Sequence, residues 1–311
     1  MYAHCDYDLI IIGGGPAGLT AGLYASRAKL STAIIEKSTS GGRIANAELV
    51  ENFPGFPSGV SGSELSARMM SQMMQAGVEF IRTEATGVEL RDELKCVNTA
   101  QGDYSAEALI IAGGCQPKKL GVPGEEELIG GGISYCAFCD GSHFAGQPVA
   151  VIGGGDGGIT EGLYMTRIAS RVTVIEILPC LGAAKILQER VRENPKMDIL
   201  CSTKVEAITT EGNMRVLRLK NTETGEKSVL EVSGIFVLIG LVPETAYLKG
   251  LVELDEDGFV KVTTNLETSV PGIFAAGDIR GGSSRQAIAA AGDGATAALS
   301  AEKFITFKQR L

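Results

Sequence analysis

The sequence predicts an α/β protein of two domains, the second inserted into the first. Three observations predict this: an internal repeat, the glycine turns that carry it, and the length of the chain. Residues 9–12 are an apolar run that leads into the glycine-rich segment 13–18, and residues 149–152 lead in the same way into 153–158. A chain of 311 residues is long enough for two cores.

The repeat continues beyond the glycines at a constant offset of 140 residues. Residues 22–24 match residues 162–164, and Glu36 matches Glu176. Each copy has an apolar strand, a glycine turn, a helix of small and apolar residues, and a second apolar strand that ends in glutamate. That order is the βαβ unit of nucleotide-binding folds. Two copies therefore predict two Rossmann-like nucleotide-binding domains.

Proline and glycine mark the crossovers between the predicted domains. Segment 116–124 contains two prolines and two glycines, and residues 241–244 look like the return. The first domain is therefore expected to comprise residues 1–117 and 246–311, with the second domain, residues 118–245, inserted between them.

Three further elements follow from apolar spacing and alanine content. Apolar residues recur every four positions over residues 63–76, which predicts an amphipathic helix. Residues 293–304 are rich in alanine and predict a C-terminal helix, and the apolar run 235–242 predicts a buried strand.

Charge and hydropathy exclude several classes of protein. A net charge of −9 argues against nucleic acid as a partner, because phosphates need a basic surface. No apolar run approaches the ~20 residues of a membrane span, and the first residues hold no apolar stretch of signal-peptide length. The chain is therefore expected to be cytoplasmic and off the membrane. In that reducing setting its seven cysteines are expected as free thiols, with any close pair catalytic or metal-binding.

The first glycine turn predicts a dinucleotide site. Gly13 makes the tight turn, Gly15 lets the backbone approach a pyrophosphate, and Gly18 lets the helix pack on the sheet. The start of that helix presents N–H groups and a positive dipole end to phosphates. Glu36, 23 residues after Gly13, can accept a hydrogen bond from an adenosine ribose hydroxyl. The alternative is a glycine turn with a structural role alone.

Segment 268–278 favours FAD as that dinucleotide. It reads as a turn and a short buried strand, followed by Gly277 and Asp278. An aspartate at such a strand end can hold a ribitol hydroxyl, while Gly277 admits the cofactor backbone. By itself, the same segment also fits a solvated aspartate at the end of a strand.

Cys136 and Cys139 form the candidate reactive centre. Two thiols at this spacing can close a small disulfide ring, and local N–H dipoles can lower the pKa of one thiol. Asp140 follows at once, so it could protonate a leaving thiolate or a flavin, or it could cap a turn.

The rival interpretation of the cysteine pair is half of a zinc site. Such a site needs a second pair of cysteines or histidines. Cys180 and Cys201 stand alone, and the only histidines are His4 and His143. The sequence therefore favours redox chemistry and predicts no metal site.

In this order, these segments resemble the low-molecular-weight thioredoxin reductase family. The resemblance covers essentially the whole chain, and Cys-Ala-x-Cys-Asp just before the second glycine turn is its most specific part. It rests on residues 13–18, 51–55, 136–141, 153–158, 275–278 and 285–287.

The resemblance implies a homodimer that binds FAD and reduces thioredoxin or a thioredoxin-like protein. Its two domains would rotate to alternate flavin reduction with thiol exchange. It also implies that Cys139 faces the flavin, Cys136 attacks the target disulfide and Asp140 is the acid/base. The family's FAD-contacting segments map onto Gly42, Asn52, Asp278, Arg285 and Gln286.

The departures from the family concern the electron donor. Typical members carry His-Arg-Arg-x-x-x-Arg after the second strand of the inserted domain, where it grips the 2′-phosphate of NADPH. This chain has Glu176, Ile177 and Leu178 there, with Gly182 at the last basic position, and Gly113 stands where threonine is common. The chain thus resembles the branch that does not use NADPH. Members of that branch use NADH, reduced ferredoxin or a donor that is not assigned. NADH would bind here at a site of Gly153, Gly155, Gly158 and Glu176.

Two other functions fit the same motifs. One is a flavin-dependent dithiol oxidase that uses oxygen to close small-molecule dithiols. The other is a flavin-bearing redox sensor that is not an enzyme and signals through its thiol pair.

Overall fold

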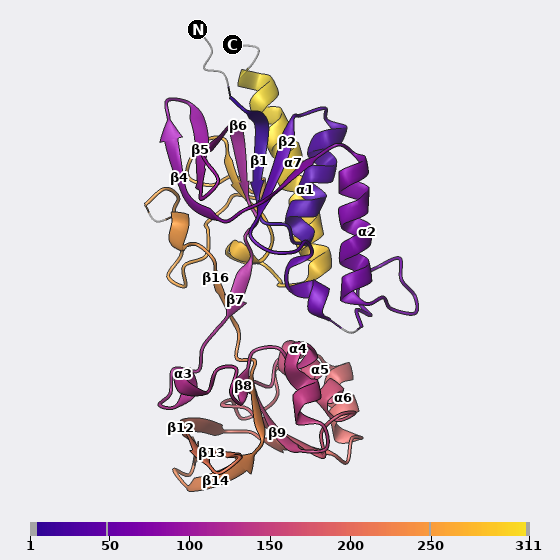
Figure 1. The fold of residues 1–311 in the computed structure, drawn as a ribbon, viewed down its shortest axis with the longest axis vertical. Helices are drawn as coiled ribbons and strands as arrows, with labels where there is room; N and C mark the ends of the chain where they lie inside the picture. The colour runs from indigo at the N-terminus through magenta and orange to yellow at the C-terminus, as the bar shows by residue number, and fades with distance from the viewer. Residues whose placement is uncertain (1–4, 48, 249, 309–311) are drawn as a thin grey trace. The chain divides into compact units, whose positions relative to one another are not determined.

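The computed structural model describes residues 5–47, 49–248 and 250–308 (Figure 1). His4 lies outside the described residues. The chain divides into two compact units, the first formed by Met1–Gln116 with Val242–Leu311 and the second by Pro117–Leu241. The return to the first unit comes at Val242, four residues before the boundary expected from the sequence.

The first unit is built on a seven-stranded sheet of order β3-β2-β1-β6-β5-β4, with β17 also paired to β6. Its central strand β1 is parallel to β2 and β6, and Leu9, Ile10 and Ile11 within it are fully buried. Strands buried on both faces read as continuous apolar runs, which is why this one was visible in the sequence. The bounds are β1 Tyr7–Ile12, β2 Thr32–Glu36, β3 Glu79–Arg82, β4 Ala85–Arg91, β5 Leu94–Thr99, β6 Tyr104–Ile111 and β17 Ile273–Ala275.

Three helices flank this sheet: α1 (Pro16–Arg27), α2 (Gly62–Gln75) and α7 (Ala287–Lys308). Helices α1 and α7 pack closely, since a Cβ on Gly294 would lie 2.1 Å from the carbonyl oxygen of Ala17. Helix α2 confirms the amphipathic helix predicted there, and its start is capped because Ser61 Oγ accepts from Glu64 N–H.

Helix α7 begins six residues earlier than predicted, at Ala287. Residues 287–291 are strong helix formers, and Asp293 does not cap the helix, because its carboxylate pairs with Arg280.

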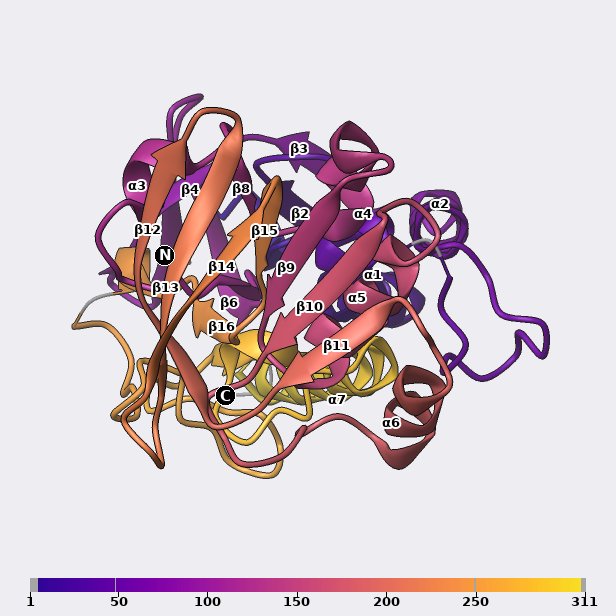
Figure 2. The same cartoon turned by 90° about the horizontal axis from the view of Figure 1, so that it is seen from below.

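The second unit contains a five-stranded sheet of order β11-β10-β9-β15-β8, whose paired strands all run parallel. Figure 2 shows β9, β10 and β11 side by side, with α5 (Asp156–Met165) and α6 (Lys185–Arg192) beside them. A three-stranded antiparallel sheet, β12-β13-β14, completes the unit. The bounds are β8 Ile133–Ser134, β9 Pro148–Ile152, β10 Arg171–Ile175, β11 Met197–Leu200, β12 Thr203–Glu211, β13 Met214–Asn221, β14 Lys227–Val232 and β15 Gly234–Val237.

The buried strand predicted over residues 235–242 ends earlier, at Val237. Gly240 has a φ of 121°, which breaks the extended chain before β16 (Leu241–Pro243) begins. β16 then pairs with β7 (Cys115–Pro117), so the two crossovers form a short ribbon. This two-domain α/β architecture confirms the predicted fold class.

Candidate active site

The first glycine turn forms a cradle lined by backbone. Gly13 has a φ of 111°, and a Cβ there would lie 2.2 Å from the carbonyl oxygen of Ala112. A Cβ on Gly18 would lie 1.8 Å from the carbonyl oxygen of Gly13, so α1 packs directly on the turn. Beside Gly15 the space is open, because the nearest atom to a Cβ there is the Cα of Gly42, at 4.0 Å. A phosphate can therefore approach the backbone between Gly15 and Gly42.

Glu36 ties the end of β2 to this turn. One carboxylate oxygen accepts from Gly14 N–H at 2.7 Å, and the other accepts from the backbone and side chain of Ser38 at 2.8 and 2.9 Å. Oε2 accepts only one of these bonds and keeps a lone pair, so the carboxylate can also accept from a ribose hydroxyl.

Gly277 and Asp278 form another side of the cradle, next to the start of α1. A Cβ on Gly277 would lie 3.0 Å from the Cβ of Ala17, which places this segment against the start of α1. Gly277 N–H donates to Asp293 Oδ2 at 3.0 Å, and Asp293 also forms a partly buried bidentate pair with Arg280. Burial raises the pKa of Asp278, while a hydrogen bond from Ser283 and the charges of Arg285 and Arg43 oppose that rise.

Two segments far apart in sequence meet beside this part of the cradle. Asn52 Nδ2 donates to Gln286 Oε1 at 3.0 Å, across 234 residues of chain. Arg285 has a φ of 57°, and its guanidinium lies 5.1 Å from the ring centroid of Phe259. The sequence-predicted residues Asn52, Arg285 and Gln286 are thus held around one place.

A further observation indicates that the cradle fits a dinucleotide such as FAD. Ser66, Arg215 and Tyr247 hold the buried side-chain atoms that lack a hydrogen-bond partner within the described ranges. Two of them lie next to glycines that adjoin the cradle: Ser66 Oγ lies 2.3 Å from where a Cβ on Gly41 would be, and the Tyr247 hydroxyl lies 3.3 Å from a Cβ on Gly113. Hydroxyls left without partners at a glycine-lined opening match a ligand that carries many polar atoms.

The redox loop lies in the second unit. Cys136 and Cys139 are joined by a disulfide, with Cα atoms 5.4 Å apart. Cys136 is the N-cap of the short helix α4 (Ala137–Asp140), and its Sγ accepts from Cys139 N–H at 3.2 Å. That N–H would stabilise a thiolate on Cys136 once the disulfide opens.

Asp140 is held next to the pair by a buried serine. Ser134 Oγ donates to Asp140 Oδ2 at 2.6 Å and accepts from Cys136 N–H at 3.1 Å. Asp140 is partly buried at the end of α4, four residues after Cys136. The aspartate is thus oriented by the same residue that positions the cysteine backbone.

Glu161, on α5, holds the redox loop through a hydrogen bond. Its side chain is only 9% exposed, and its Oε2 accepts from Ala137 N–H at 2.5 Å. This bond satisfies the first N–H of α4 and fixes the loop to the helix that follows the second glycine turn.

The second glycine turn repeats the geometry of the first. Gly153 has a φ of 118°, and a Cβ on Gly158 would lie 1.9 Å from the carbonyl oxygen of Gly153. Gly155 is open, with nothing within 4 Å of a Cβ. Glu176 is 8% exposed, and its two oxygens accept from Gly154 N–H at 2.5 Å and Leu178 N–H at 2.9 Å.

The surroundings of this second turn are apolar. Ile177 and Leu178, where the resembling family has basic residues, are 57% and 55% exposed. Leu181 covers the turn, since its Cδ2 lies 2.7 Å from where a Cβ on Gly154 would be. Residues 176–184 contain no lysine, arginine or histidine.

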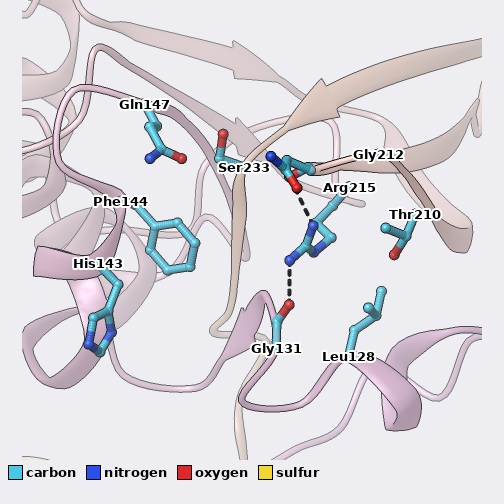
Figure 3. Close-up of a pocket in the computed structure, with 10 residues that line it drawn as sticks. Leu128, Gly131, His143, Phe144, Gln147, Thr210, Gly212, Arg215 and Ser233 are labelled. Carbon is cyan, nitrogen blue, oxygen red and sulfur yellow. Dashed lines mark hydrogen bonds between the residues drawn. The ribbon is translucent and has the colours of Figure 1, made fainter.

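A separate pocket of about 540 Å³ lies in the second unit (Figure 3). Arg215 crosses it, donating to the carbonyl oxygens of Gly131 and Asn213 at 2.5 and 2.9 Å. None of the site residues predicted from the sequence lines this pocket. Its lining is Leu128, Gly131, His143, Phe144, Gln147, Thr210, Gly212, Asn213, Arg215 and Ser233.

The remaining cysteines contribute no second reactive pair within the described chain. Burial raises the pKa of the Cys115 thiol to about 12, and its Sγ donates to the carbonyl oxygen of Asp278 at 3.1 Å. Such a thiol stays protonated and unreactive near neutral pH. Across residues 5–47, 49–248 and 250–308, no group of three histidine, cysteine or acidic residues could hold a metal ion.

Sequence reasoning missed three residues that hold the predicted ones in place: Ser134, Glu161 and Asp293. Ser134 had a local signal, because it lies two residues before Cys136. Glu161 is an acid within a helix of small and apolar residues, which marks it as unusual without revealing its partner. Asp293 had no signal, because its partners lie on another segment.

Together, the two glycine-turn domains and the cysteine pair define a dinucleotide-dependent disulfide oxidoreductase. The chain matches the pyridine nucleotide-disulphide oxidoreductase family over residues 7–294. It is 45% identical to a thioredoxin reductase of Bacillus subtilis over 300 residues, covering 96% of this chain and 95% of that protein. A thioredoxin reductase of Listeria innocua is 43% identical, with coverage of 96% and 94%.

Solved structures agree with these relatives. The thioredoxin reductase of Lactococcus lactis superposes with a TM-score of 0.94 at 37% identity, covering 97% of this chain and all of that one (100%). That of T. acidophilum gives a TM-score of 0.92 at 35% identity, with coverage of 96% and 99%. The chain belongs to the low-molecular-weight thioredoxin reductase family of FAD-binding disulfide oxidoreductases, and it is an enzyme.

No helix in the described part of the chain is long and apolar enough to cross a membrane.

Proposed function

We propose that this protein reduces the disulfide of thioredoxin or a thioredoxin-like protein, with FAD in the first unit and Cys136–Cys139 as the exchanging pair. The observation that carries the proposal is the closed Cys136–Cys139 disulfide beside an aspartate that Ser134 orients. The named relatives support the substrate class, because they are thioredoxin reductases. We include in the proposal the homodimer and the cytoplasmic location expected from the sequence.

The cofactor would be held by the first glycine turn, with phosphates at the start of α1, a ribose at Glu36 and the ribitol near Asp278. FAD, when bound, supplies the electron pair that opens the cysteine disulfide. The start of α1 offers backbone N–H groups, and Arg43 and Arg285 add positive charge around Asp278.

The thiol exchange then proceeds through the two cysteines. The Cys136 thiolate attacks one sulfur of the substrate disulfide, forms a mixed disulfide and releases the other substrate sulfur as a thiolate. Asp140 donates a proton to that leaving sulfur. The Cys139 thiolate next attacks Cys136 Sγ, which restores the Cys136–Cys139 disulfide and releases the second substrate thiolate. Two electrons thus pass to the substrate, and its second thiolate takes a proton from water, so that it leaves as a dithiol.

The donor in this proposal is NADH or reduced ferredoxin, and NADPH is a poor one. The apolar surroundings of the second glycine turn support this, because Ile177 and Leu178 are exposed where the family carries arginines. A 2′-phosphate would find no cation among residues 176–184 and would meet the carboxylate of Glu176. The geometry at Gly153, Gly155 and Gly158 leaves NADH binding open, since Glu176 can accept from a 2′-hydroxyl.

The first test is flavin content and trapping of the substrate. The purified protein should be yellow with about one FAD per chain, because one cradle fits the dinucleotide. Cys139→Ser should leave Cys136 able to hold thioredoxin as a mixed disulfide, visible by non-reducing electrophoresis, because the resolving thiol is missing. Cys136→Ser is the matched control and should trap nothing. Trapping by Cys136→Ser alone would reverse the roles of the two cysteines.

A second measurement separates reduction from the two rival functions. Oxygen uptake with a dithiol and no added donor would indicate a dithiol oxidase. Failure to turn over any disulfide, with capture of a partner in one redox state only, would indicate a sensor. Thioredoxin reduction under anaerobic conditions with an added donor supports the proposal against both.

A further inference from the structure

Tyr247 places an unsatisfied hydroxyl against the cofactor cradle. The residue lies in the short helix η3 (Ala246–Leu248), and its ring packs against the apolar cluster under the sheet of the first unit. Its hydroxyl is buried and lacks a hydrogen-bond partner among the described residues. A phenylalanine would fill the same space without the cost of desolvating a hydroxyl. A buried hydroxyl of this kind therefore calls for a partner that the protein itself does not supply.

The hydroxyl is directed at Gly113, the position where the family commonly has threonine. A Cβ on Gly113 would lie 3.3 Å from the Tyr247 oxygen and 3.5 Å from Ile279 Cδ1. Gly113 in turn borders the first turn, because its nitrogen lies 2.9 Å from where a Cβ on Gly13 would be. The tyrosine oxygen thus occupies the space into which a threonine side chain would extend.

The neighbours of Tyr247 locate this space at the adenosine end of the cradle. Lys37, the residue after Glu36, pairs with Glu244 at 3.4 Å, and Glu244 N–H donates to the carbonyl oxygen of Gly114 at 3.1 Å. Glu36 is the carboxylate placed for the adenosine ribose. Burial, with the nearby charge of Glu244, raises the pKa of Tyr247, so its hydroxyl stays protonated and can donate.

We propose that Tyr247 is a cofactor-binding residue of this chain, whose hydroxyl donates a hydrogen bond to the adenosine half of FAD beside Gly113. The Tyr247 oxygen occupies the space beside Gly113 where the family commonly has a threonine side chain. The inference rests on the proposed function, because it requires FAD in the first unit.

The test is a double-mutant cycle on apoprotein, with FAD and ADP as the titrated ligands. ADP carries the adenosine half alone, so it reports the same contact without the flavin. Tyr247→Phe should raise the dissociation constants of both ligands about three- to tenfold, the usual worth of one hydrogen bond. The melting temperature of the apoprotein should stay the same or rise, because an unsatisfied hydroxyl is removed. Opposite signs for stability and affinity distinguish a ligand contact from a structural role.

Gly113→Thr supplies the second arm of the cycle. The backbone of Gly113 lies outside the left-handed region, so threonine is compatible with its conformation. In the wild-type background the new side chain should crowd the Tyr247 oxygen and weaken FAD binding. In the Tyr247→Phe background it should restore affinity for FAD and ADP, because the threonine hydroxyl replaces the lost donor.

Tyr7→Phe is the matched control. Tyr7 packs in the same apolar cluster, but its hydroxyl donates to Glu79 at 2.8 Å and lies at the start of β1, away from the glycine turn. This variant should leave both dissociation constants unchanged. Wild-type affinity in Tyr247→Phe, or no rescue by Gly113→Thr, would overturn the role of Tyr247 alone. A wild-type apoprotein that binds no FAD would overturn the proposed function as well.

Discussion

The two glycine turns of this protein share a backbone but differ in what surrounds them. Gly13 and Gly153 have φ values of 111° and 118°, and a Cβ on Gly18 or Gly158 would lie 1.8 or 1.9 Å from the preceding turn. In each unit a glutamate at the end of the second strand accepts from the N–H of the middle glycine. These contacts lie within the protein, so packing of helix on strand is enough to require the glycines, whether or not a ligand binds.

What differs is the lining of each opening. The first turn faces Gly42, and nearby lie the buried hydroxyls of Ser66 and Tyr247 and the positive charges of Arg43 and Arg285 around Asp278. The second turn faces Leu181 and the exposed side chains of Ile177 and Leu178. A Gly-x-Gly-x-x-Gly motif therefore identifies a fold, and the residues around it decide which ligand, if any, it takes.

The largest effect is expected at the redox loop, which only the second unit carries. Asp140→Asn should slow thioredoxin reduction by about 10²–10⁴, the usual range for losing a general acid/base, with flavin content near normal. Asp156→Asn is the matched control, because Asp156 accepts from Ala184 N–H, a bond that an asparagine oxygen can still accept, and the rate should hold. An unchanged rate in Asp140→Asn would mean that Asp140 has only a structural role, as the cap of its turn.

The next largest effect concerns the choice of electron donor, which depends on the residues around the second turn. Each missing Arg–phosphate contact forfeits about 1.5–3 kcal/mol, and Glu176 adds repulsion of about 1–4 kcal/mol. NADPH should therefore bind at least about a thousandfold more weakly than at a site with those arginines, a penalty of about 4 kcal/mol. Anaerobic bleaching of the flavin with NADH, NADPH and reduced ferredoxin in turn measures this.

A gain-of-function variant sharpens the same comparison. Combining Glu176→His, Ile177→Arg and Leu178→Arg should make NADPH a better donor, because cations replace an acid at the 2′-phosphate. Efficient NADPH-driven turnover by the unmodified protein at micromolar cofactor would refute the assignment of this site. If NADH is the donor, Glu176→Ala should weaken its activity, whereas activity with ferredoxin alone would indicate a second turn with no nucleotide role.

A smaller effect is expected from matched alanine substitutions at the two open glycines. Gly15 and Gly155 have nearly the same extended backbone, with φ of −79° and −80°, so alanine fits both folds. Gly15→Ala should weaken FAD binding about tenfold to a hundredfold, because its methyl group meets the pyrophosphate. Gly155→Ala should leave FAD affinity unchanged, as measured by flavin titration of the apoprotein. Equal loss of flavin in both variants would contradict the assignment of FAD to the first turn.

The smallest effect is a pH dependence of apoprotein stability. Burial raises the pKa of Asp278, so the folded apoprotein binds this proton more tightly than the unfolded chain does. Its stability should therefore fall as pH rises from the ordinary aspartate pKa through the raised one, and stay at the lower level above it. Asp278→Asn should flatten this part of the melting-temperature profile, above about pH 4, because its side chain does not titrate. The exposed Asp257→Asn should leave the slope unchanged, and a wild-type slope of the opposite sign would refute the prediction.

Much of the fold was predictable because its signals are local. The glycine turns, the strands that precede them and the glutamates that follow lie within about 30 residues of each other, the span of one βαβ unit. The cysteine pair needs only two residues between its members. The start of α7 was missed because the helix was predicted from the alanine-rich residues 293–304 alone, whereas residues 287–291 also belong to it.

The sequence by itself determined the two βαβ modules, the glycine turns and the cysteine pair, because sterics and ring closure act over a few neighbouring residues. Only the tertiary structure decided which distant residues meet: Asn52 with Gln286, Glu161 with Ala137, and Tyr247 with Gly113. Such pairs depend on how helices and loops pack on the sheets, and no spacing along the chain records that packing. The lining of the first opening depends on that packing, whereas the residues beside the second turn, 176–184, can be read from the sequence.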